Sequence, residues 1–170
     1  MGNEFFTELL GSKHNKSSFT CGKYLLDNYL QKQAGQDLKR KLAVCYVLNE
    51  HSIDRIKGYY TLSNSSIHAD WIPSELRKKL PPSYNAIPTT LIGRLAIDSD
   101  FQGKGLGKLL LVDALKRCFE LSVLLGSFAV IVDPLDLEAE RFYQKYGFIK
   151  LPDSGKMFLP MRTIEQLFEQ

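Results

Sequence analysis

Residues Arg94–Lys108 read RLAIDSDFQGKGLGK, an apolar strand followed by a glycine-rich turn and the start of an apolar helical pattern. In the turn, Gly103, Gly105 and Gly107 alternate with other residues. Because glycine reaches positive φ and has no Cβ, successive backbone N–H groups can turn toward one anion, and the positive end of the helix dipole adds to the attraction. The stretch therefore predicts a strand–loop–helix site for a ligand that carries phosphate.

Two common nucleotide-binding patterns do not fit this loop. A Rossmann fingerprint that begins at Gly103 and Gly105 needs glycine at the position of Lys108. A P-loop needs a Gly-Lys pair followed by Ser or Thr, whereas Lys104 is followed by Gly105 and Lys108 is followed by leucine. A strand-to-helix turn without a ligand is the alternative. It is disfavoured because each glycine near a helix start costs about 0.5–1 kcal/mol.

The apolar pattern on either side of this stretch predicts a mixed α/β fold. The expected strands are 5–10, 42–48, 56–63, 90–97, 128–132, 148–151 and 157–161. The expected helices are 21–39, with a break near Gly35, and 73–79, 105–121 and 137–146. An antiparallel meander that leads into a β-α-β-α-β half gives a mixed sheet.

Length and composition are those of one soluble globular domain spanning 1–170. The chain has 44% hydrophobic and 24% charged residues, which excludes a disordered or collagen-like chain, and it has no apolar stretch long enough to span a membrane. Its net charge, 22 − 19 = +3, is compatible with a nucleic-acid partner but does not argue for one. Three cysteines without a CxxC pair favour a reducing, cytoplasmic setting.

The loop resembles that of the GCN5-related N-acetyltransferases (GNAT), whose Arg/Gln-x-x-Gly-x-Gly/Ala motif binds the pyrophosphate of acetyl-coenzyme A. Gln102, Gly105 and Gly107 match that motif, and the order of elements is similar over nearly the whole chain. The resemblance implies a central, mostly antiparallel sheet with helices on both faces and a splayed parallel pair at the cofactor cleft. In the family, the strand before the loop pairs its backbone with the pantetheine arm. The residues assigned in this way to acetyl-coenzyme A are Leu95, Ala96, Ile97, Gln102, Gly103, Lys104, Gly105, Leu106, Gly107, Lys108, Asp133 and Phe142.

Four segments in order look like the acetyltransferase toxins of bacterial toxin–antitoxin pairs, which acetylate the amino acid of charged tRNA. They are residues 19–30, 58–63, 91–98 and 142–148. The resemblance implies an aminoacyl-tRNA substrate, a small DNA-binding antitoxin that silences the toxin, and a homodimer.

Tyr143 is the candidate catalytic residue, because the resemblance places it where the family keeps its general acid. A phenol with a pKa near 10 is protonated at pH 7 and can give a proton to a departing thiolate, whose thiol has a pKa near 8.5. The alternative is that Tyr143, like Phe142, only packs the last predicted helix onto the sheet. The three histidines lie in polar surroundings without metal-ligand spacing and read as solvated, so the sequence shows no convincing general base and we expect no metal.

Basic residues supply the candidates for tRNA contact, namely Lys32, Arg40, Arg77, Lys78 and Arg94. Phosphate contacts of this kind give salt-dependent, largely sequence-independent affinity. The alternative is that helix charges are simply solvated, and Arg94 could contact either ligand or form a structural ion pair.

Two other functions stay open from the sequence. One is an acetyltransferase of the same fold that acts on a small amine or a protein. The other is a binding protein that uses the glycine loop to sense the cofactor without catalysis, although such a protein has no need for the phenol of Tyr143.

Overall fold

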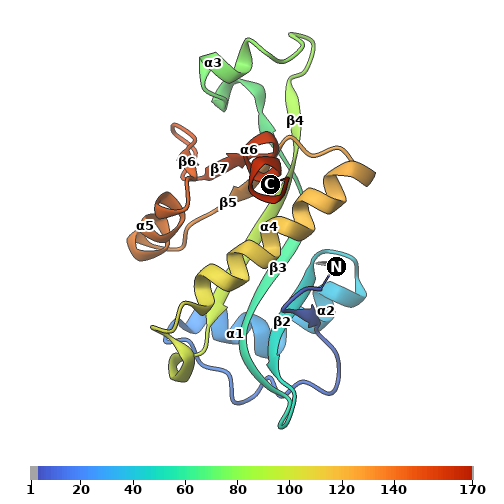
Figure 1. The fold of residues 1–170 in the computed structure, drawn as a ribbon, viewed down its shortest axis with the longest axis vertical. Helices are drawn as coiled ribbons and strands as arrows, with labels where there is room; N and C mark the ends of the chain where they lie inside the picture. Colours follow the sequence, from blue (N-terminus) through green and yellow to red (C-terminus); the bar gives the residue numbers. More distant parts are fainter. Residues whose placement is uncertain (1–3, 170) are drawn as a thin grey trace. The chain divides into compact units, whose positions relative to one another are not determined.

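The computed structural model describes residues 4–169, which divide into two compact units. Unit 1 comprises the residues up to Ser63 together with Gly93–Leu115, and unit 2 comprises Asn64–Ile92 together with the residues from Lys116 onward. The strands are β1 (Glu8–Leu9), β2 (Val44–Glu50), β3 (Arg55–His68), β4 (Ala86–Ile97), β5 (Ala129–Val132), β6 (Ile149–Lys150) and β7 (Met157–Pro160) (Figure 1). The helices are α1 (Tyr24–Lys32), α2 (Ala34–Lys39), α3 (Ser74–Arg77), α4 (Leu106–Leu124), α5 (Leu137–Lys145) and α6 (Met161–Phe168), with short 3-10 helices η1 (Ala69–Trp71) and η2 (Ser99–Phe101).

The mixed sheet expected from the sequence is confirmed. Its strand order is β1-β2-β3-β4-β5-β7-β6. β2 runs antiparallel to β1 and β3, β7 runs antiparallel to β5 and β6, and β4 runs parallel to β5. The parallel ladder uses only Thr89–Ile92 of β4, so the C-terminal part of that strand, Gly93–Ile97, continues past it.

Unit 1 has helices on both faces of its strands. On one face, Tyr29 of α1 and Ala34 of α2 are buried in a cluster with Tyr59 of β3. Side chains alternate along a strand, so the next residue, Tyr60, points to the opposite face, where α4 crosses β3 (Figure 1). The Tyr60 hydroxyl donates a 2.7 Å hydrogen bond to the buried carboxylate of Asp113 in α4. The two helical layers therefore hold β3 and β4 from both sides.

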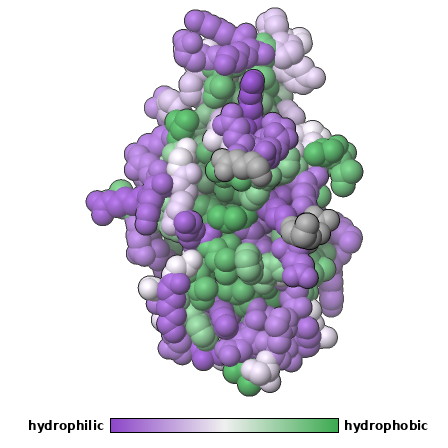
Figure 2. All heavy atoms as spheres, viewed as in Figure 1, coloured by the Kyte–Doolittle hydropathy of each residue, from purple (hydrophilic) through white to green (hydrophobic). Residues whose placement is uncertain are grey.

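Unit 2 has its own core, in which Ile87, Ile131 and Phe158 join β4, β5 and β7. One apolar group stays outside this core. Val123 and Leu124 of α4 and the following Leu125 are more than half exposed, and Figure 2 shows hydrophobic side chains at this end of the helix, at the right edge of the view. Within residues 4–169, no helix is long and apolar enough to cross a membrane.

Several element boundaries differ from the sequence-based prediction. The break between α1 and α2 lies at Gln33, with φ −120° and ψ −36°, rather than near Gly35. α6 was not predicted, although buried Met161 and Ile164 stand at helical spacing. The solvated interpretation of His14 is wrong, because its side chain is buried.

The ring of His14 is held in a loop of unit 1. Its Nδ1 accepts the N–H of Gly11 at 2.9 Å, so the neutral ring carries its proton on Nε2, which lies 2.8 Å from the carboxylate of Glu8. This hydrogen bond is the largest influence that lowers the pKa of Glu8.

Candidate active site

The glycine loop lies in unit 1 between η2 and α4. Gly103 and Gly105 both have φ +77°, and a Cβ placed on either would meet nothing within 4 Å. Glycine is therefore required by the backbone conformation and not by crowding. Gly107 lies inside the first turn of α4 and has no positive φ.

The amides of residues 103–108 form a concentrated group of hydrogen-bond donors. Within residues 4–169, no oxygen accepts a hydrogen bond from any of them, and the first bond of the helical type runs from the N–H of Leu109 to the carbonyl of Gly105 at 3.3 Å. Lys104 and Lys108 are exposed beside them and form no ion pair with a described residue. Unpartnered amides, two cations and the positive end of α4 fit a pyrophosphate.

The end of β4 offers a second group of backbone donors and acceptors. The N–H of Asp98 donates to Lys57 of β3 at 2.8 Å, so the carbonyl of Ile97 points to the opposite edge. The carbonyl of Pro88 also points to that edge, where it accepts from Phe128 just before β5.

In a regular strand, carbonyls that point to the same edge belong to every second residue, so they are separated by an even number of positions. Pro88 and Ile97 are separated by 97 − 88 = 9 positions, which is an odd number. β4 therefore contains one extra residue, as in a β-bulge. After it, the backbone groups of Leu95 and the N–H of Ile97 face the edge that β5 does not cover. Ala96 points its side chain into the core of unit 1. This arrangement fits the expected pairing with an extended pantetheine arm.

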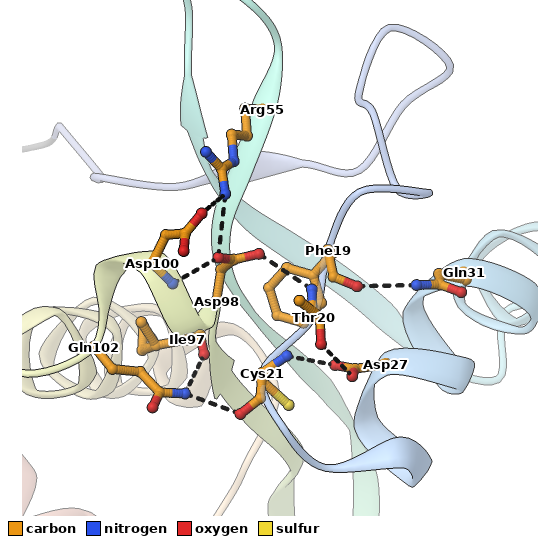
Figure 3. Close-up of polar contacts among 10 residues, drawn as sticks. All are labelled: Phe19, Thr20, Cys21, Asp27, Gln31, Arg55, Ile97, Asp98, Asp100 and Gln102. Carbon is orange, nitrogen blue, oxygen red and sulfur yellow. Dashed lines mark hydrogen bonds and ion pairs between the residues drawn. The ribbon is translucent and has the colours of Figure 1, made fainter.

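Gln102 contributes to the loop through its side-chain amide. Nε2 donates to the carbonyl of Cys21 and to that of Ile97, each at 2.9 Å (Figure 3). Both amide hydrogens are thereby used within the protein. Leu106, the remaining cofactor candidate of the loop, begins α4.

Tyr143 lies in unit 2 on α5, a helix whose first turn is capped by Asp136, which accepts the N–H of Ala139 at 2.9 Å. The Tyr143 side chain is buried against the rings of Phe142 and Phe148, at centroid distances of 5.2 and 5.3 Å. Burial raises the pKa of its hydroxyl above the ordinary value, and the hydroxyl makes no hydrogen bond with residues 4–169. Tyr143 is therefore a neutral phenol whose proton is not held by another protein group.

The other cofactor candidates of unit 2 have protein partners. Asp133, just after β5, is exposed and lies 3.4 Å from the ammonium of Lys156. Phe142 is half-buried and contacts the rings of Tyr143 in α5 and of Tyr146, which follows α5 directly.

The candidate tRNA residues fall into both units and have different surroundings. Lys32 and Arg40 are exposed at the ends of α1 and α2. Arg77 donates to the carbonyls of Pro81, Pro82 and Tyr84, which fold the insertion after α3, and Lys78 lies 3.7 Å from Glu75.

Arg94 differs from these because it is half-buried on β4. Its guanidinium lies 3.5 Å from the centroid of the Tyr29 ring, and the Tyr29 hydroxyl donates to Asp37 at 2.8 Å. Arg94 makes no ion pair with residues 4–169, so the structural ion pair considered from the sequence is absent there. A stacked guanidinium keeps its N–H groups available for an anion or carbonyl.

Sequence reasoning missed Asp98, a buried carboxylate beside the loop. Its two oxygens accept from the N–H groups of Thr20 and Asp100 at 3.1 and 3.0 Å, and Arg55 lies 3.3 Å away (Figure 3). The Asp-x-Asp pattern before Phe101 is a local signal for a turn, but the partner at Thr20 is far away in the sequence.

Comparison with known proteins gives one family. The model of the acetyltransferase (GNAT) domain matches residues 85–163. A tRNA-acetylating toxin of Mycobacterium tuberculosis is 36% identical over 153 residues, which cover 89% of this chain and 89% of that protein. A probable toxin TacT of Sinorhizobium fredii is 29% identical over 164 residues, covering 92% and 90% of the two chains.

Solved structures of the same kind superpose closely. A tyrosine-to-phenylalanine mutant of KacT matches with TM-score 0.90 and 30% identity, covering 95% of this chain and 98% of that one. AtaT complexed with acetyl-methionyl-tRNAfMet matches with TM-score 0.88 and 31% identity, at 95% and 98% coverage. A tyrosine-to-phenylalanine mutant of AtaT, bound to acetyl-CoA and the C-terminus of the antitoxin AtaR, matches with TM-score 0.82 and 28% identity, at 96% and 98% coverage.

Proposed function

Since the chain belongs to the GNAT acetyltransferase family, we propose that it is a toxin that acetylates the amino group of aminoacyl-tRNA and so blocks translation. It is an acetyl-CoA-dependent N-acetyltransferase. The observation that carries this function is the run of unpartnered amides at residues 103–108, which follows the open edge of β4. The similarity to a tRNA-acetylating toxin over nine-tenths of both chains supports the choice of substrate.

The residues of the chain account for the needs of acetyl transfer. Acetyl-coenzyme A supplies the activated acetyl group as a thioester. The amides of the loop, with Lys104 and Lys108, hold its pyrophosphate, and Leu95 and Ile97 align the pantetheine arm along β4. Tyr143 keeps its proton at neutral pH because burial raises its pKa, and it donates that proton to the sulfur as the thiolate departs.

A general base is not required for this substrate. An α-amino group has a pKa of about 7.7–8.0, and esterification to tRNA lowers it further, so a useful neutral fraction exists at pH 7. A lysine amine, with a pKa near 10.4, would need more help. The chemistry therefore favours an α-amine as acceptor.

The experiment is transfer of radiolabelled acetyl from acetyl-CoA to total charged tRNA, resolved by amino acid. Label in the tRNA fraction is expected, and label only in free amines or proteins would replace the proposal with the second function considered from the sequence. Tyr143→Phe should lower kcat by about 10²-fold or more, as for loss of a general acid. The matched control is Tyr146→Phe, which follows the same helix directly and whose ring also contacts Phe142.

The same proposal extends to partners and setting. We assign Lys32, Arg40, Lys78 and Arg94 to tRNA contact, with Arg77 shaping the insertion that carries Lys78. A small DNA-binding antitoxin silences the enzyme, in keeping with the likeness to AtaT bound to AtaR.

We further propose that the two units form one acetyltransferase domain, which β3, β4 and α4 run through, and that the enzyme acts as a homodimer in the cytoplasm, where charged tRNA is found. Light scattering at micromolar concentration tests the homodimer.

A further inference from the structure

The short segment Phe19–Cys21, here called the strap, runs beside the end of β4 and the start of the glycine loop. The N–H of Thr20 donates to Asp98 at 3.1 Å, and the carbonyl of Thr20 accepts from the N–H of Ser99 at 2.8 Å. The carbonyl of Cys21 accepts from the side chain of Gln102 at 2.9 Å. Three hydrogen bonds thus join the strap to residues 98–102.

The other side of the strap is bonded to α1. The N–H of Cys21 donates to Asp27 at 2.8 Å, and Gln31 donates to the carbonyl of Phe19 at 2.9 Å (Figure 3). The Thr20 hydroxyl donates to the second oxygen of Asp27 at 3.2 Å. Every backbone polar group of Thr20 and Cys21 therefore has a side-chain or backbone partner on α1 or in residues 98–102.

Gln102 is the last residue before the backbone turns to φ +77° at Gly103. Its Nε2 also holds the carbonyl of Ile97, the last residue of β4. The side-chain amide of Gln102 therefore holds the end of β4 and the start of the glycine loop, and it sets the distance of both from the strap. Since both amide hydrogens are used, the side-chain N–H groups of Gln102 are not available to a ligand.

We propose that Gln102 is a positioning residue, which sets the glycine loop for coenzyme A by holding Ile97 and the strap, and that Asp27 acts on the same loop from α1 through the strap. This inference rests on the acetyl-coenzyme A site proposed above. It also gives a physical reason why the family motif accepts Arg or Gln at this position: both side chains carry at least two N–H donors that can reach two carbonyls.

The test is the dissociation constant of coenzyme A alone, measured by titration calorimetry, together with the KM for acetyl-CoA and kcat. Gln102→Met keeps the length of the side chain and removes both donors. We expect its dissociation constant and KM to rise about 10-fold, as for two lost hydrogen bonds, with kcat at saturation within about 2-fold of wild type. Gln102→Arg should restore binding to within about 3-fold, because it returns donors to both carbonyls.

The matched control is Gln36→Met, which makes the same chemical change on α2, where Nε2 donates only to the carbonyl of Lys32 in the helix before it. It should bind coenzyme A as wild type does. Asp27→Ala, which lies on α1, should raise the dissociation constant about 3-fold. It serves as the second variant if Gln102→Met unfolds.

Unchanged binding in folded Gln102→Met, or equal loss in the Met and Arg variants, would overturn the proposal for Gln102. Unchanged binding in Asp27→Ala would overturn the part played by the strap. Failure of the wild-type protein to bind coenzyme A would overturn the proposed function instead, so the two failures are distinguishable.

Discussion

Gly58 of β3 lies where the strand meets both β4 and α4, and its replacement by alanine should destabilise the protein. A Cβ at this position would lie 2.7 Å from Cδ1 of Ile97, 2.9 Å from the carbonyl oxygen of Ala96 and 2.9 Å from Cδ1 of Leu110. The two methyl groups end flexible side chains, but the oxygen belongs to the backbone of β4 and cannot rotate away. Overpacking of this kind costs about 1–3 kcal/mol.

For a protein of this size, 1 kcal/mol changes the melting temperature by about 2–4 °C, so a cost of about 1–3 kcal/mol should lower the melting temperature of Gly58→Ala by about 2–12 °C. Because the displaced backbone includes Ala96, the KM for acetyl-CoA should rise as well. The control is Gly126→Ala, since a Cβ there meets nothing within 4 Å. A Gly58→Ala protein that melts within about 1 °C of wild type, with an unchanged KM, would refute the contact argument.

Two further predictions concern the glycine loop and the N-terminal loop. Gly105→Ala should weaken coenzyme A binding by about 5–30-fold in calorimetry, because alanine at φ +77° costs about 1–2 kcal/mol. Gly107→Ala, in the helix, should change binding by less than about 2-fold. Equal effects of the two substitutions would contradict the conformational explanation. The hydrogen bond from His14 keeps the pKa of Glu8 below its ordinary value of 4.5 in the folded protein, so the stability it provides is present above that pH and is lost as the pH falls below it. In urea unfolding, the free energy of unfolding of the wild type should exceed that of Glu8→Gln by less than about 1 kcal/mol at about pH 6, because the pair is partly exposed. This difference should shrink as the pH falls to about pH 3. A difference that stays constant with pH would rule out the carboxylate as its source.

The glycine loop and the mixed sheet were predictable because their signals are local. Positive φ at Gly103 and Gly105 is a property of the residues themselves, and the apolar run of β5 is continuous in the sequence. The length of β3 was underestimated because polar residues follow Ser63, yet the strand continues to His68 in unit 2. A prediction from hydrophobic pattern ends a strand at its last buried residue, whereas hydrogen bonds to a neighbouring strand can extend the strand beyond that residue.

The surroundings of the loop could not be predicted, because they depend on contacts between distant residues. Gln102 and Cys21 are 81 positions apart, and Thr20 and Asp98 are 78 apart. No periodicity or motif connects such pairs, since their polar atoms meet only after the fold has formed. The buried state of His14 was missed for the same kind of reason, because its partner Glu8 lies in a short strand with little sequence signal.

The structure also explains why each position of the Arg/Gln-x-x-Gly-x-Gly/Ala motif accepts the residues that it does. Gln102 must donate to two carbonyls at once, which glutamine and arginine can do and most other residues cannot. Gly105 adopts φ +77°, which disfavours a Cβ on conformational grounds even though space is available. Gly107 lies in the helix, a backbone conformation that alanine also adopts. The three positions are thus set by the number of N–H donors, by backbone handedness and by helix geometry respectively, and together they leave the loop amides directed to one anion.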